Sequence, residues 1–394
     1  MTWTAYEQGR LAVDRRDYGA ARELLREAGA DAAAMLLLGQ LAGAGLGGPV
    51  DPEEKQAWYE RAAALGSAEA AYNLGAIHAG AGRHAEGLAW YLRAAELGDG
   101  GGLRMAGVMY ATGQGVPADD REAERLLLAA AERVPEAAFD LGALYAYRRD
   151  DPAAAARWYL EAAKEDGARA LEHLEALVPR LRESAATSTR ARTMLGVILA
   201  FHLGEQAAAT ALLADTDGDP EALRSLAFLI ASGPEDRRDT AKATALYRMA
   251  ADAGDGYAAH NLGVTATDPR AAVRWLRQAA ESGVHESIPH LANRLSELDI
   301  DDEALRWYVR GAEAGHTGCM FAAACWYRDG FGGPVDRVRA LRWYLTLLGT
   351  GNGDALHEAH QIVALMSDDE IREAGRLSGR LTDAEVFLAR RRAA

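Results

Sequence analysis

The chain has 394 residues, of which 43 are Lys or Arg and 58 are Asp or Glu, so its formal net charge is −15. This acidic balance disfavours nucleic acid and anionic membrane surfaces as main partners, because both repel negative charge. The N-terminus has no basic segment followed by an apolar core, and no apolar run approaches the roughly 18 residues of a membrane span. We therefore expect a cytoplasmic protein without a signal peptide or a membrane helix.

The residue types favour an all-α chain without disulfides. Alanine is abundant and runs of β-branched residues are few, which favours helices over strands. The chain has two cysteines, Cys319 and Cys325, which lie six residues apart. On one helix they would point to different faces, so we expect two small core residues and no disulfide between them.

The first predicted element is a helical hairpin over residues 4–29. Residues 17–19 (DYG) supply its turn, and apolar residues recur at helical spacing in its second half. This hairpin has the simpler pattern of a tetratricopeptide-type unit.

The next stretch, from Ala34 to Gly66, reads AMLLLGQLAGAGLGGPVDPEEKQAWYERAAALG and predicts two short helices joined by a glycine-rich turn. Glycine and proline in the turn cannot continue the first helix. Asp51 is the predicted N-cap of the second helix, Pro52 its first residue and Glu54 its capping-box partner. One such hairpin cannot bury both of its apolar faces, so copies of it must stack.

Copies of this unit recur along the chain. Most of them share an LG-like pair in the first helix and a Trp-Tyr pair or its equivalent in the second, and all but the copy that ends at Glu132 close with a glycine. They span residues 71–98, 103–132, 138–167, 222–254, 258–283, 291–315 and 320–349. Equivalent positions are about 29 to 36 residues apart, which is typical of helix-turn-helix solenoids. Because the aromatic pairs recur at helical spacing, we expect Trp58, Trp90 and Trp343 to be core residues.

These residues resemble the Sel-one-like repeat, a close relative of the tetratricopeptide repeat. The resemblance rests on the LG pair, on a tyrosine near the end of the first helix (Tyr110, Tyr145, Tyr327), on the GxG-x-P-x-D turn and on WYxxAAxxG. It implies an all-α fold, a right-handed α-α superhelix (solenoid) of Sel-one-like and tetratricopeptide-like helical hairpins. Exported members of the family often carry a cysteine pair in each repeat, and this sequence does not.

The repeat pattern breaks after residue 167, which predicts a division of the chain. We expect an N-terminal helical hairpin (1–30), a first repeat arm (31–183), a second repeat arm (184–351) and C-terminal capping helices (352–394). Pro179 is expected to interrupt the last helix of the first arm. Residues 184–189 form the most loop-like stretch, and we expect a hinge there.

The chain ends in two predicted helices with polar faces. Ser367 with Glu370, and Thr382 with Glu385, have the spacing of capping boxes. Such helices would shield the apolar face of the last repeat from water.

Three short motifs suggest chemistry, but each has a structural explanation. Residues 299–302 (DIDD) match an acid motif of protonating terpene cyclases, yet they lie in an inter-helix turn where Asp residues cap a helix. The aspartates of residues 215–219 lack the glycine and glutamate positions of a calcium loop. His357 and His360 lack the HExxH spacing of a zinc site. We therefore expect no catalytic residue, no metal and no cofactor.

The resemblance places binding in a concave groove lined by the first helices. In tetratricopeptide-like units the second, fifth, ninth and twelfth residues of the first helix face inward when the LG leucine is the seventh. Aromatic residues and arginine at such positions favour protein recognition. The candidate partner-binding residues are Tyr72, Arg104, Phe139, Thr193, Arg224, Phe228, Tyr257, His260, Phe321 and Arg328. We expect roughly half of them to be exposed.

These features predict a non-catalytic adaptor or scaffold that binds a partner protein segment in the concave groove. Arg104, Arg224 and Arg328 would pair with carboxylates or carbonyls of the partner.

Two alternatives stay open. One is an immunity or regulatory protein dedicated to one partner, which an apolar patch confined to one arm would favour. The other is an enzyme or an accessory subunit of an enzyme with a groove-located site, which perturbed titratable groups in one deep pocket would favour.

Overall fold

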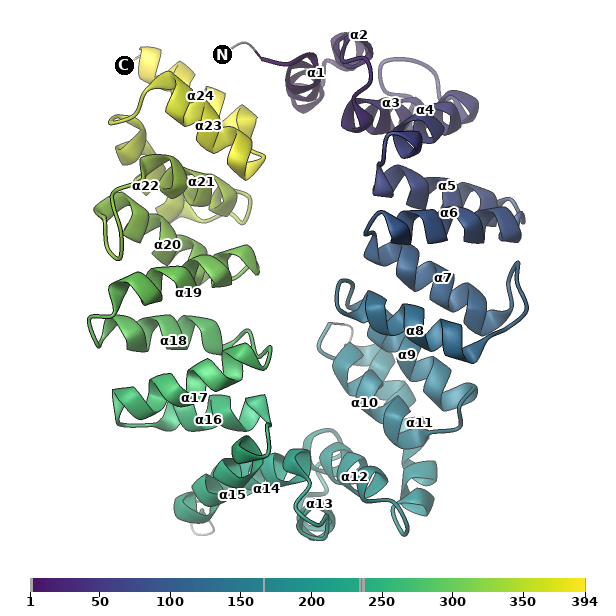
Figure 1. The fold of residues 1–394 in the computed structure, drawn as a ribbon, viewed down its shortest axis with the longest axis vertical. Helices are drawn as coiled ribbons and strands as arrows, with labels where there is room; N and C mark the ends of the chain where they lie inside the picture. Colours follow the sequence, from purple (N-terminus) through teal and green to yellow (C-terminus); the bar gives the residue numbers. More distant parts are fainter. Residues whose placement is uncertain (1–2, 166, 234, 236–237, 394) are drawn as a thin grey trace. The chain divides into compact units, whose positions relative to one another are not determined.

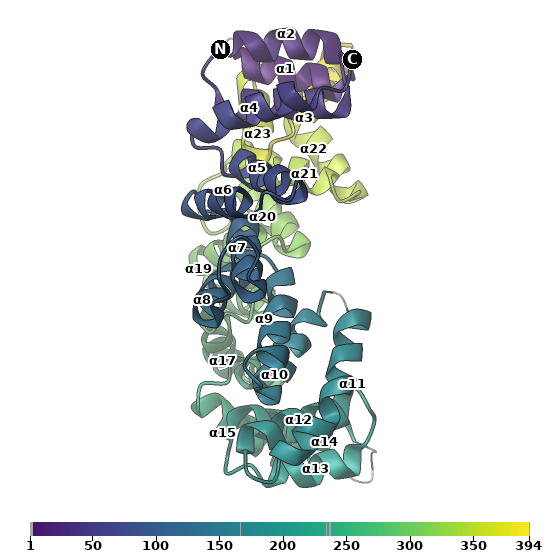
Figure 2. The ribbon, with the colours of Figure 1, turned by 90° about the vertical axis from the view of Figure 1, so that its right-hand side faces the viewer.

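The computed structural model describes residues 3–165, 167–233, 235 and 238–393. In these residues the chain forms 24 α-helices and no β-strand (Figure 1). Successive helices pair as hairpins, and Figure 2 shows the hairpins from α1–α2 to α9–α10 following one another along the stack. The predicted all-α solenoid of helical hairpins is confirmed.

The chain separates into two compact units, Met1–Leu203 and Gly204–Ala394. The helices of the first, unit 1, are α1 (Ala5–Asp14), α2 (Tyr18–Glu27), α3 (Ala32–Ala44), α4 (Pro52–Ala64), α5 (Ala68–Gly80), α6 (His84–Glu96), α7 (Gly100–Thr112), α8 (Asp120–Ala131), α9 (Glu136–Tyr147), α10 (Pro152–Ala162), α11 (Gly167–Ser184) and α12 (Thr189–Phe201). In this unit α12 packs against both α10 and α11. The division predicted after residue 183 stays a prediction.

The second compact unit, unit 2, continues the same pattern. Its helices are α13 (Gln206–Ala214), α14 (Pro220–Ser232), α15 (Thr240–Asp252), α16 (Gly256–Thr265), α17 (Pro269–Glu281), α18 (Ser287–Ser296), α19 (Asp301–Glu313), α20 (Thr317–Asp329), α21 (Arg337–Leu348), α22 (Gly353–Val363), α23 (Asp368–Ser378) and α24 (Leu381–Ala393). None of the helices in the described part of the chain is both long and apolar enough to cross a membrane.

Aspartate side chains begin many of the helices, as the sequence predicts. The carboxylate of Asp51 accepts a hydrogen bond of 2.8 Å from the backbone N–H of Glu54, which satisfies one of the free donors at the start of α4. The predicted capping-box role of Glu54 is wrong. Its carboxylate instead accepts hydrogen bonds from Arg22, from Arg26 and from the Trp58 indole, so it ties α4 to α2 of the preceding hairpin.

Within a hairpin, the LG glycine of the first helix lies directly against a tyrosine of the second. A Cβ atom on Gly75 would lie 2.6 Å from Cδ1 of Tyr91, and one on Gly39 would lie 2.5 Å from Cε1 of Tyr59. Glycine therefore lets the two backbones approach until the ring covers the space that a side chain would need. Gly142 and Tyr159 repeat the arrangement in α9 and α10.

The tyrosine of these Trp-Tyr pairs is the more deeply buried residue in unit 1. Tyr91 is 3% exposed, whereas Trp58 and Trp90 are half-buried and pack against the edge of the core, so the expectation that both tryptophans are core residues holds only in part. The arginine that follows Trp58 on α4, Arg61, stacks its guanidinium over the indole ring at 4.9 Å. Trp343 in unit 2 is buried as expected.

The GxG turns pack onto the preceding hairpin. Gly47, between α3 and α4, has a φ of 75°, and a Cβ there would lie 2.5 Å from the carbonyl oxygen of Tyr18 at the start of α2. Gly115, between α7 and α8, has the same φ and meets the backbone of His84 at the start of α6. Only glycine fits both the left-handed backbone and the contact, so the turn motif links one repeat to the next.

Helix α11 continues through Pro179 to Ser184, so the predicted interruption is wrong. A proline inside a helix costs about 3 kcal/mol, because one backbone hydrogen bond is lost and the ring crowds the preceding turn. Three leucines, Leu174, Leu177 and Leu181, are buried along one face of this helix. Their packing on both sides of the proline outweighs its local preference.

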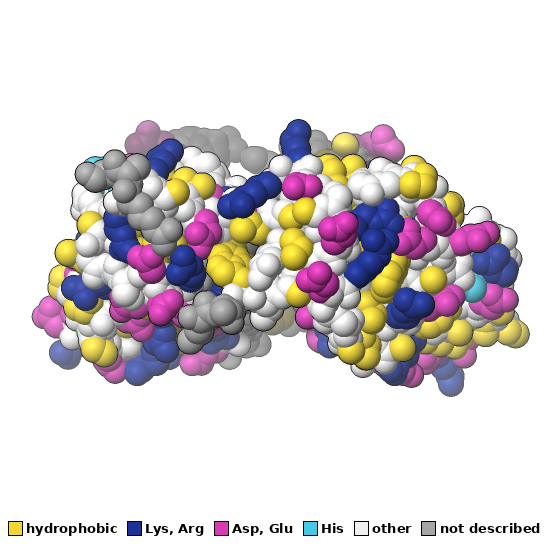
Figure 3. Space-filling model, turned by 90° about the horizontal axis from the view of Figure 1, so that it is seen from above, with side chains coloured by type: hydrophobic (Ala, Val, Ile, Leu, Met, Phe, Trp, Pro, Cys, Tyr) yellow, Lys and Arg dark blue, Asp and Glu magenta, His cyan; other side chains and the backbone are white. Residues whose placement is uncertain are grey.

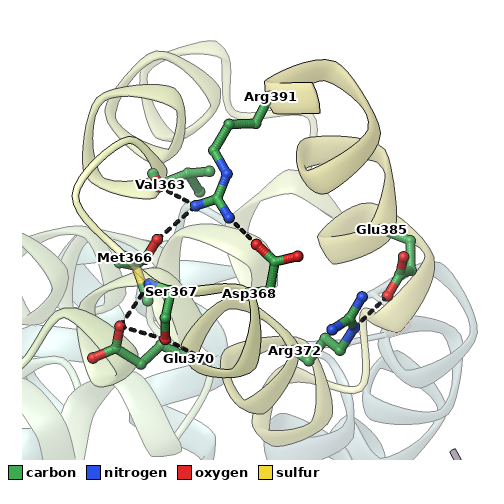
Figure 4. Close-up of polar contacts among 8 residues, drawn as sticks. All are labelled: Val363, Met366, Ser367, Asp368, Glu370, Arg372, Glu385 and Arg391. Carbon is green, nitrogen blue, oxygen red and sulfur yellow. Dashed lines mark hydrogen bonds and ion pairs between the residues drawn. The ribbon is translucent and has the colours of Figure 1, made fainter. Parts of the chain in front are cut away.

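The last three helices are joined by polar contacts at their ends (Figure 4). Ser367 and Glu370 form the predicted capping box at the start of α23. Arg391 of α24 donates to the carbonyl oxygens of Val363 and Met366, at 3.2 and 2.5 Å, and pairs with Asp368. This guanidinium therefore binds the last carbonyl group of α22 and one in the segment between α22 and α23.

The second predicted capping box is wrong. Helix α24 begins at Leu381, so Thr382 lies within its first turn rather than before it. The Glu385 carboxylate accepts a hydrogen bond of 2.8 Å from Nε of Arg372 on α23 instead (Figure 4). The sequence spacing was right for a cap, but the ion pair between the two helices takes the carboxylate.

Candidate functional site on the first-helix face

The candidate binding residues lie on the first helix of each hairpin, and polar contacts join successive first helices. Gln40 of α3 donates to Glu69 of α5 at 3.0 Å, and Nδ1 of His260 on α16 lies 2.8 Å from the hydroxyl of Ser287 on α18. We name the surface formed by the first helices α3, α5, α7, α9 and α11 the first-helix face of unit 1. The corresponding surface of α14, α16, α18, α20 and α22 is the first-helix face of unit 2.

The candidate residues are less exposed than expected. Phe228 and Tyr257 are 46% and 39% exposed. Thr193 on α12 is 1% exposed and is wrong as a contact residue, because α12 packs against both α10 and α11. The other seven are half-buried: Tyr72, Arg104, Phe139, Arg224, His260, Phe321 and Arg328.

The three candidate arginines form ion pairs with neighbouring first helices. Nε of Arg104 on α7 lies 2.5 Å from Asp140 on α9. Arg224 of α14 donates to Asp255 at 2.8 Å, just before α16, and to Glu221 at 3.2 Å. Each of these side chains therefore holds its own repeat to the following one.

Arg328 of α20 is held in the same way, by two carboxylates. It donates to Asp329 at 2.6 Å and pairs with Glu358 on α22. The hydrogen bond from Arg328 lowers the pKa of Asp329, and the same bond raises the pKa of the guanidinium. Arg224 and Arg328 thus have carboxylate partners within the protein before any other molecule binds.

Three of the candidate aromatic residues, Tyr72, Phe139 and Phe321, lie against buried tyrosines of the second helices. The rings of Tyr72 and Tyr91 are 5.4 Å apart, those of Phe139 and Tyr159 are 5.3 Å apart, and those of Phe321 and Tyr344 are 5.9 Å apart. Burial raises the pKa of Tyr91, Tyr159 and Tyr344, as expected for hydroxyls removed from water. The inward aromatic side chains therefore contribute to the hairpin core with one side and to the first-helix face with the other.

One cluster on the first-helix face of unit 1 was not predicted. It combines Phe139 with Arg169 and His173 of α11. The guanidinium of Arg169 lies 3.8 Å above the Phe139 ring, and the His173 imidazole stacks on Tyr159 at 5.0 Å. Helix α11 departs from the repeat pattern, so no repeat position pointed to these residues. The run of Arg, His and small residues on one amphipathic helix was the available signal.

A pocket of about 380 Å³ opens beside this cluster. It is lined by Arg104, Pro135, Glu136, Phe139, Ala162, Glu165 and Arg169. Burial raises the pKa of Asp140, which lies at the edge of the same cluster, and the hydrogen bond from Arg104 opposes that effect. The hydroxyl of Tyr159 is buried and has no hydrogen-bond partner in the part of the chain that the structure describes.

The motifs that suggested chemistry take structural positions. Helix α19 begins at Asp301, after Ile300, so the aspartates of residues 301–302 lie in its first turn rather than at its cap. There they interact favourably with the positive end of the helix dipole. Across the residues that the structure describes, no group of three His, Cys, Asp or Glu side chains is placed to hold a metal ion.

The surface charge is mixed. On the face seen in Figure 3, acidic and basic side chains are interspersed, and hydrophobic side chains form small patches between them. The net charge of −15 is therefore not gathered into a single acidic field on that face. Local pairs of charges, rather than the total, decide what each part of the surface attracts.

Several solved structures resemble this one. The c5321 protective antigen of uropathogenic Escherichia coli strains is 24% identical with a TM-score of 0.44, covering 99% of this chain and 94% of that chain. A Sel1 repeat protein from Oxalobacter formigenes is 22% identical with a TM-score of 0.42, covering 83% and 94%. The human IFIT1 dimer with PPP-AAAA is 14% identical with a TM-score of 0.41, covering 97% and 95%. A search of curated proteins found no match.

The sequence itself matches the Sel1 repeat in nine places. The matched residues are 1–31, 32–67, 68–99, 102–133, 135–167, 220–255, 256–284, 299–316 and 318–346. They include the first hairpin, which the sequence pattern alone placed with the simpler tetratricopeptide type. Sel1 repeat proteins generally serve as scaffolds for protein interactions. The chain belongs to the Sel1 repeat family.

Proposed function

We propose that the protein is a non-catalytic scaffold that holds a segment of a partner protein on the first-helix face. The observation that carries the proposal is the composition of this face in unit 1. At its inward positions, small residues leave room beside half-buried Tyr72, Arg104 and Phe139. The residues at the ninth and twelfth positions are alanines apart from Val108, and Ala146 among them is buried: Ala76, Ala79, Val108, Ala111, Ala143 and Ala146.

This arrangement suits an extended or helical segment held by many modest contacts. Aromatic and arginine side chains supply the stronger contacts at protein interfaces, and surrounding small residues allow close approach. The ion pairs from Arg104 to Asp140 and from Arg224 to Asp255 fix neighbouring first helices before binding. A surface that is already ordered loses less conformational entropy when a partner binds, so modest contacts give useful affinity.

A bulky side chain placed on this face should block the partner. Ala76 on α5 is exposed at an inward position. We expect Ala76→Trp to weaken partner capture by about tenfold or more, because the indole would displace the partner segment there and a loss of about 1.4 kcal/mol in binding free energy corresponds to tenfold. The matched control is Ala64→Trp, because Ala64 is exposed at the end of the second helix α4.

Capture is measured by quantitative affinity purification from cells of the source organism, with each purified variant at equal concentration and equal melting temperature. A partner lost with Ala76→Trp and retained with Ala64→Trp supports the proposal. Equal capture by both variants would place binding away from the first-helix face and refute it.

A further inference from the structure

Two guanidinium groups lie near each other's aromatic neighbours on the first-helix face of unit 1, and among the described residues only one of them, that of Arg104, is paired with a carboxylate. Arg104 pairs with Asp140 through its Nε atom, and in the described part of the chain its two terminal nitrogens have no hydrogen-bond partner. Arg169 stacks on Phe139, and no carboxylate of the described residues lies within ion-pair distance of it. By contrast, Arg224 and Arg328 on the face of unit 2 each hold two carboxylates.

Both arginines line the same pocket of about 380 Å³, together with Phe139, and the Arg169 guanidinium lies over the Phe139 ring. Pro135 and Glu136 belong to the start of α9, and Arg169 lies in the first turn of α11, so two helix N-termini border this space. Their dipoles add positive potential to that of the arginines. The pocket therefore offers convergent donors and an aromatic surface at one place.

The buried hydroxyl of Tyr159 provides a second, independent sign of unmet hydrogen bonding nearby. The Tyr159 ring packs against Gly142 and His173, and its hydroxyl has no hydrogen-bond partner among the residues described. The Tyr159 ring lies 5.3 Å from the ring of Phe139, which lines the pocket, although Tyr159 itself does not line it. A buried hydroxyl without a partner costs free energy, so the residues behind the Phe139 ring are not fully satisfied.

The rim of the pocket limits which anion can enter. Glu136 and Glu165 line it, are exposed, and are not within ion-pair distance of either arginine in the described residues. They repel free anions, and they would attract a basic group beside an acidic one. An acidic side chain can still enter when its segment is already bound to the first-helix face. The bound segment raises the effective concentration of that side chain at the pocket, which offsets the repulsion.

We propose that Arg104 and Arg169 together bind one acidic side chain of the partner segment, with Phe139 packing against the apolar part of that side chain. The inference rests on the proposed function, because it names what that segment carries at this position. Charge-assisted hydrogen bonds from guanidinium to carboxylate are stronger than neutral ones, so this contact would fix the register of the segment. The partner is thus a segment with an Asp or Glu beside a basic residue, not a uniformly acidic one.

The test is selection of random peptides displayed on phage against the intact chain and its Arg169→Gln variant. The control variant is Arg121→Gln, because Arg121 is an exposed arginine at the start of the second helix α8. Peptides selected by the intact chain are expected to share an Asp or Glu at one position. That preference should persist with Arg121→Gln and disappear with Arg169→Gln.

Synthetic peptides from the selection give the quantitative result. Changing the shared acidic residue to its amide should weaken binding to the intact chain about tenfold, which corresponds to about 1.4 kcal/mol, and should change little in Arg169→Gln. Non-additivity of the two changes in a double-mutant cycle identifies a direct contact, which a merely structural role of Arg169 would not produce. Equal melting temperatures of the variants establish that folding is intact.

Different results contradict the inference and the proposed function. Selected peptides that compete at the first-helix face but carry no shared acidic residue, or keep it with Arg169→Gln, overturn the inference and leave the proposed function standing. Peptides whose binding is unaffected by Ala76→Trp, or no selection by the intact chain, contradict the proposed function itself.

Discussion

Tyr91→Ala is expected to lower the free energy of unfolding by about 3–5 kcal/mol, the range for removing a large buried aromatic side chain. The Tyr91 ring is buried between α5 and α6, lies against Gly75 and contacts Tyr72 at 5.4 Å between ring centres. Removing it leaves a cavity where the two helix backbones are too close to rearrange.

Trp90→Ala is the matched control, because Trp90 is the adjacent residue on α6 and is only half-buried. Its replacement should cost clearly less than that of Tyr91, although tryptophan is the larger side chain. Urea unfolding followed by far-ultraviolet circular dichroism measures both variants. A larger loss for Trp90→Ala would mean that the tryptophan, and not the tyrosine, is the central residue of the hairpin.

Gly75→Ala has the second-largest expected effect. A Cβ on this residue would lie 2.6 Å from Cδ1 and 2.7 Å from Cε1 of Tyr91, closer than carbon atoms normally approach. Overpacking of this kind costs about 1–3 kcal/mol. In an exposed helix the same substitution would stabilise by up to about 1 kcal/mol, because alanine has the higher helix propensity. A lower free energy of unfolding would therefore indicate close packing against Tyr91, and a higher one would indicate that helix propensity dominates.

Gly80→Ala, in the same helix, provides the control. Gly80 is exposed at the end of α5, and no atom lies within 4 Å of the position that its Cβ would take. This variant should be neutral or slightly stabilised. The double variant Gly75→Ala with Tyr91→Ala should lose less than the sum of the single losses, because removing the ring makes room for the methyl group. Strict additivity would contradict direct contact between the two positions.

The sequence predicts the hairpins well because their determinants are local. Asp51 caps a helix within three residues, and the glycine turns end one without help from the rest of the chain. Spacing alone could not decide between the two aromatic residues of a Trp-Tyr pair. Neighbours on a helix point about 100° apart, and either could face the partner helix. The tyrosine is the residue that faces the partner helix, because Gly75 on α5 leaves room for the Tyr91 ring on α6. This contact joins two helices, so the spacing within one helix does not reveal it.

The candidate site was less predictable, because exposure on the first-helix face depends on residues from the next repeat. Arg104 is paired with Asp140, which lies 36 residues further along the chain, and Arg328 with Glu358, 30 residues further. The repeat offset places a side chain on the face, but it cannot state whether the following hairpin supplies a carboxylate. Thr193 shows the same limit, since α12 packs against two helices rather than one.

Arg169 shows where the repeat pattern stops being informative. It lies on α11, which has 18 residues and follows the last regular hairpin of unit 1. No repeat position corresponds to it, yet its guanidinium reaches the ring of Phe139, which does occupy one. The arginines at regular repeat positions pair with carboxylates of the neighbouring repeat, whereas the guanidinium of Arg169 stacks on an aromatic ring instead.

The central claim, that a partner segment lies on the first-helix face, is tested most directly by photo-crosslinking. Benzoylphenylalanine replaces Ala76 on α5 in one form of the protein and Ala64 on α4 in another, and both are irradiated in cells of the source organism. The account predicts a discrete covalent adduct with a partner protein from position 76 and none from position 64. An adduct from position 64 alone would contradict it.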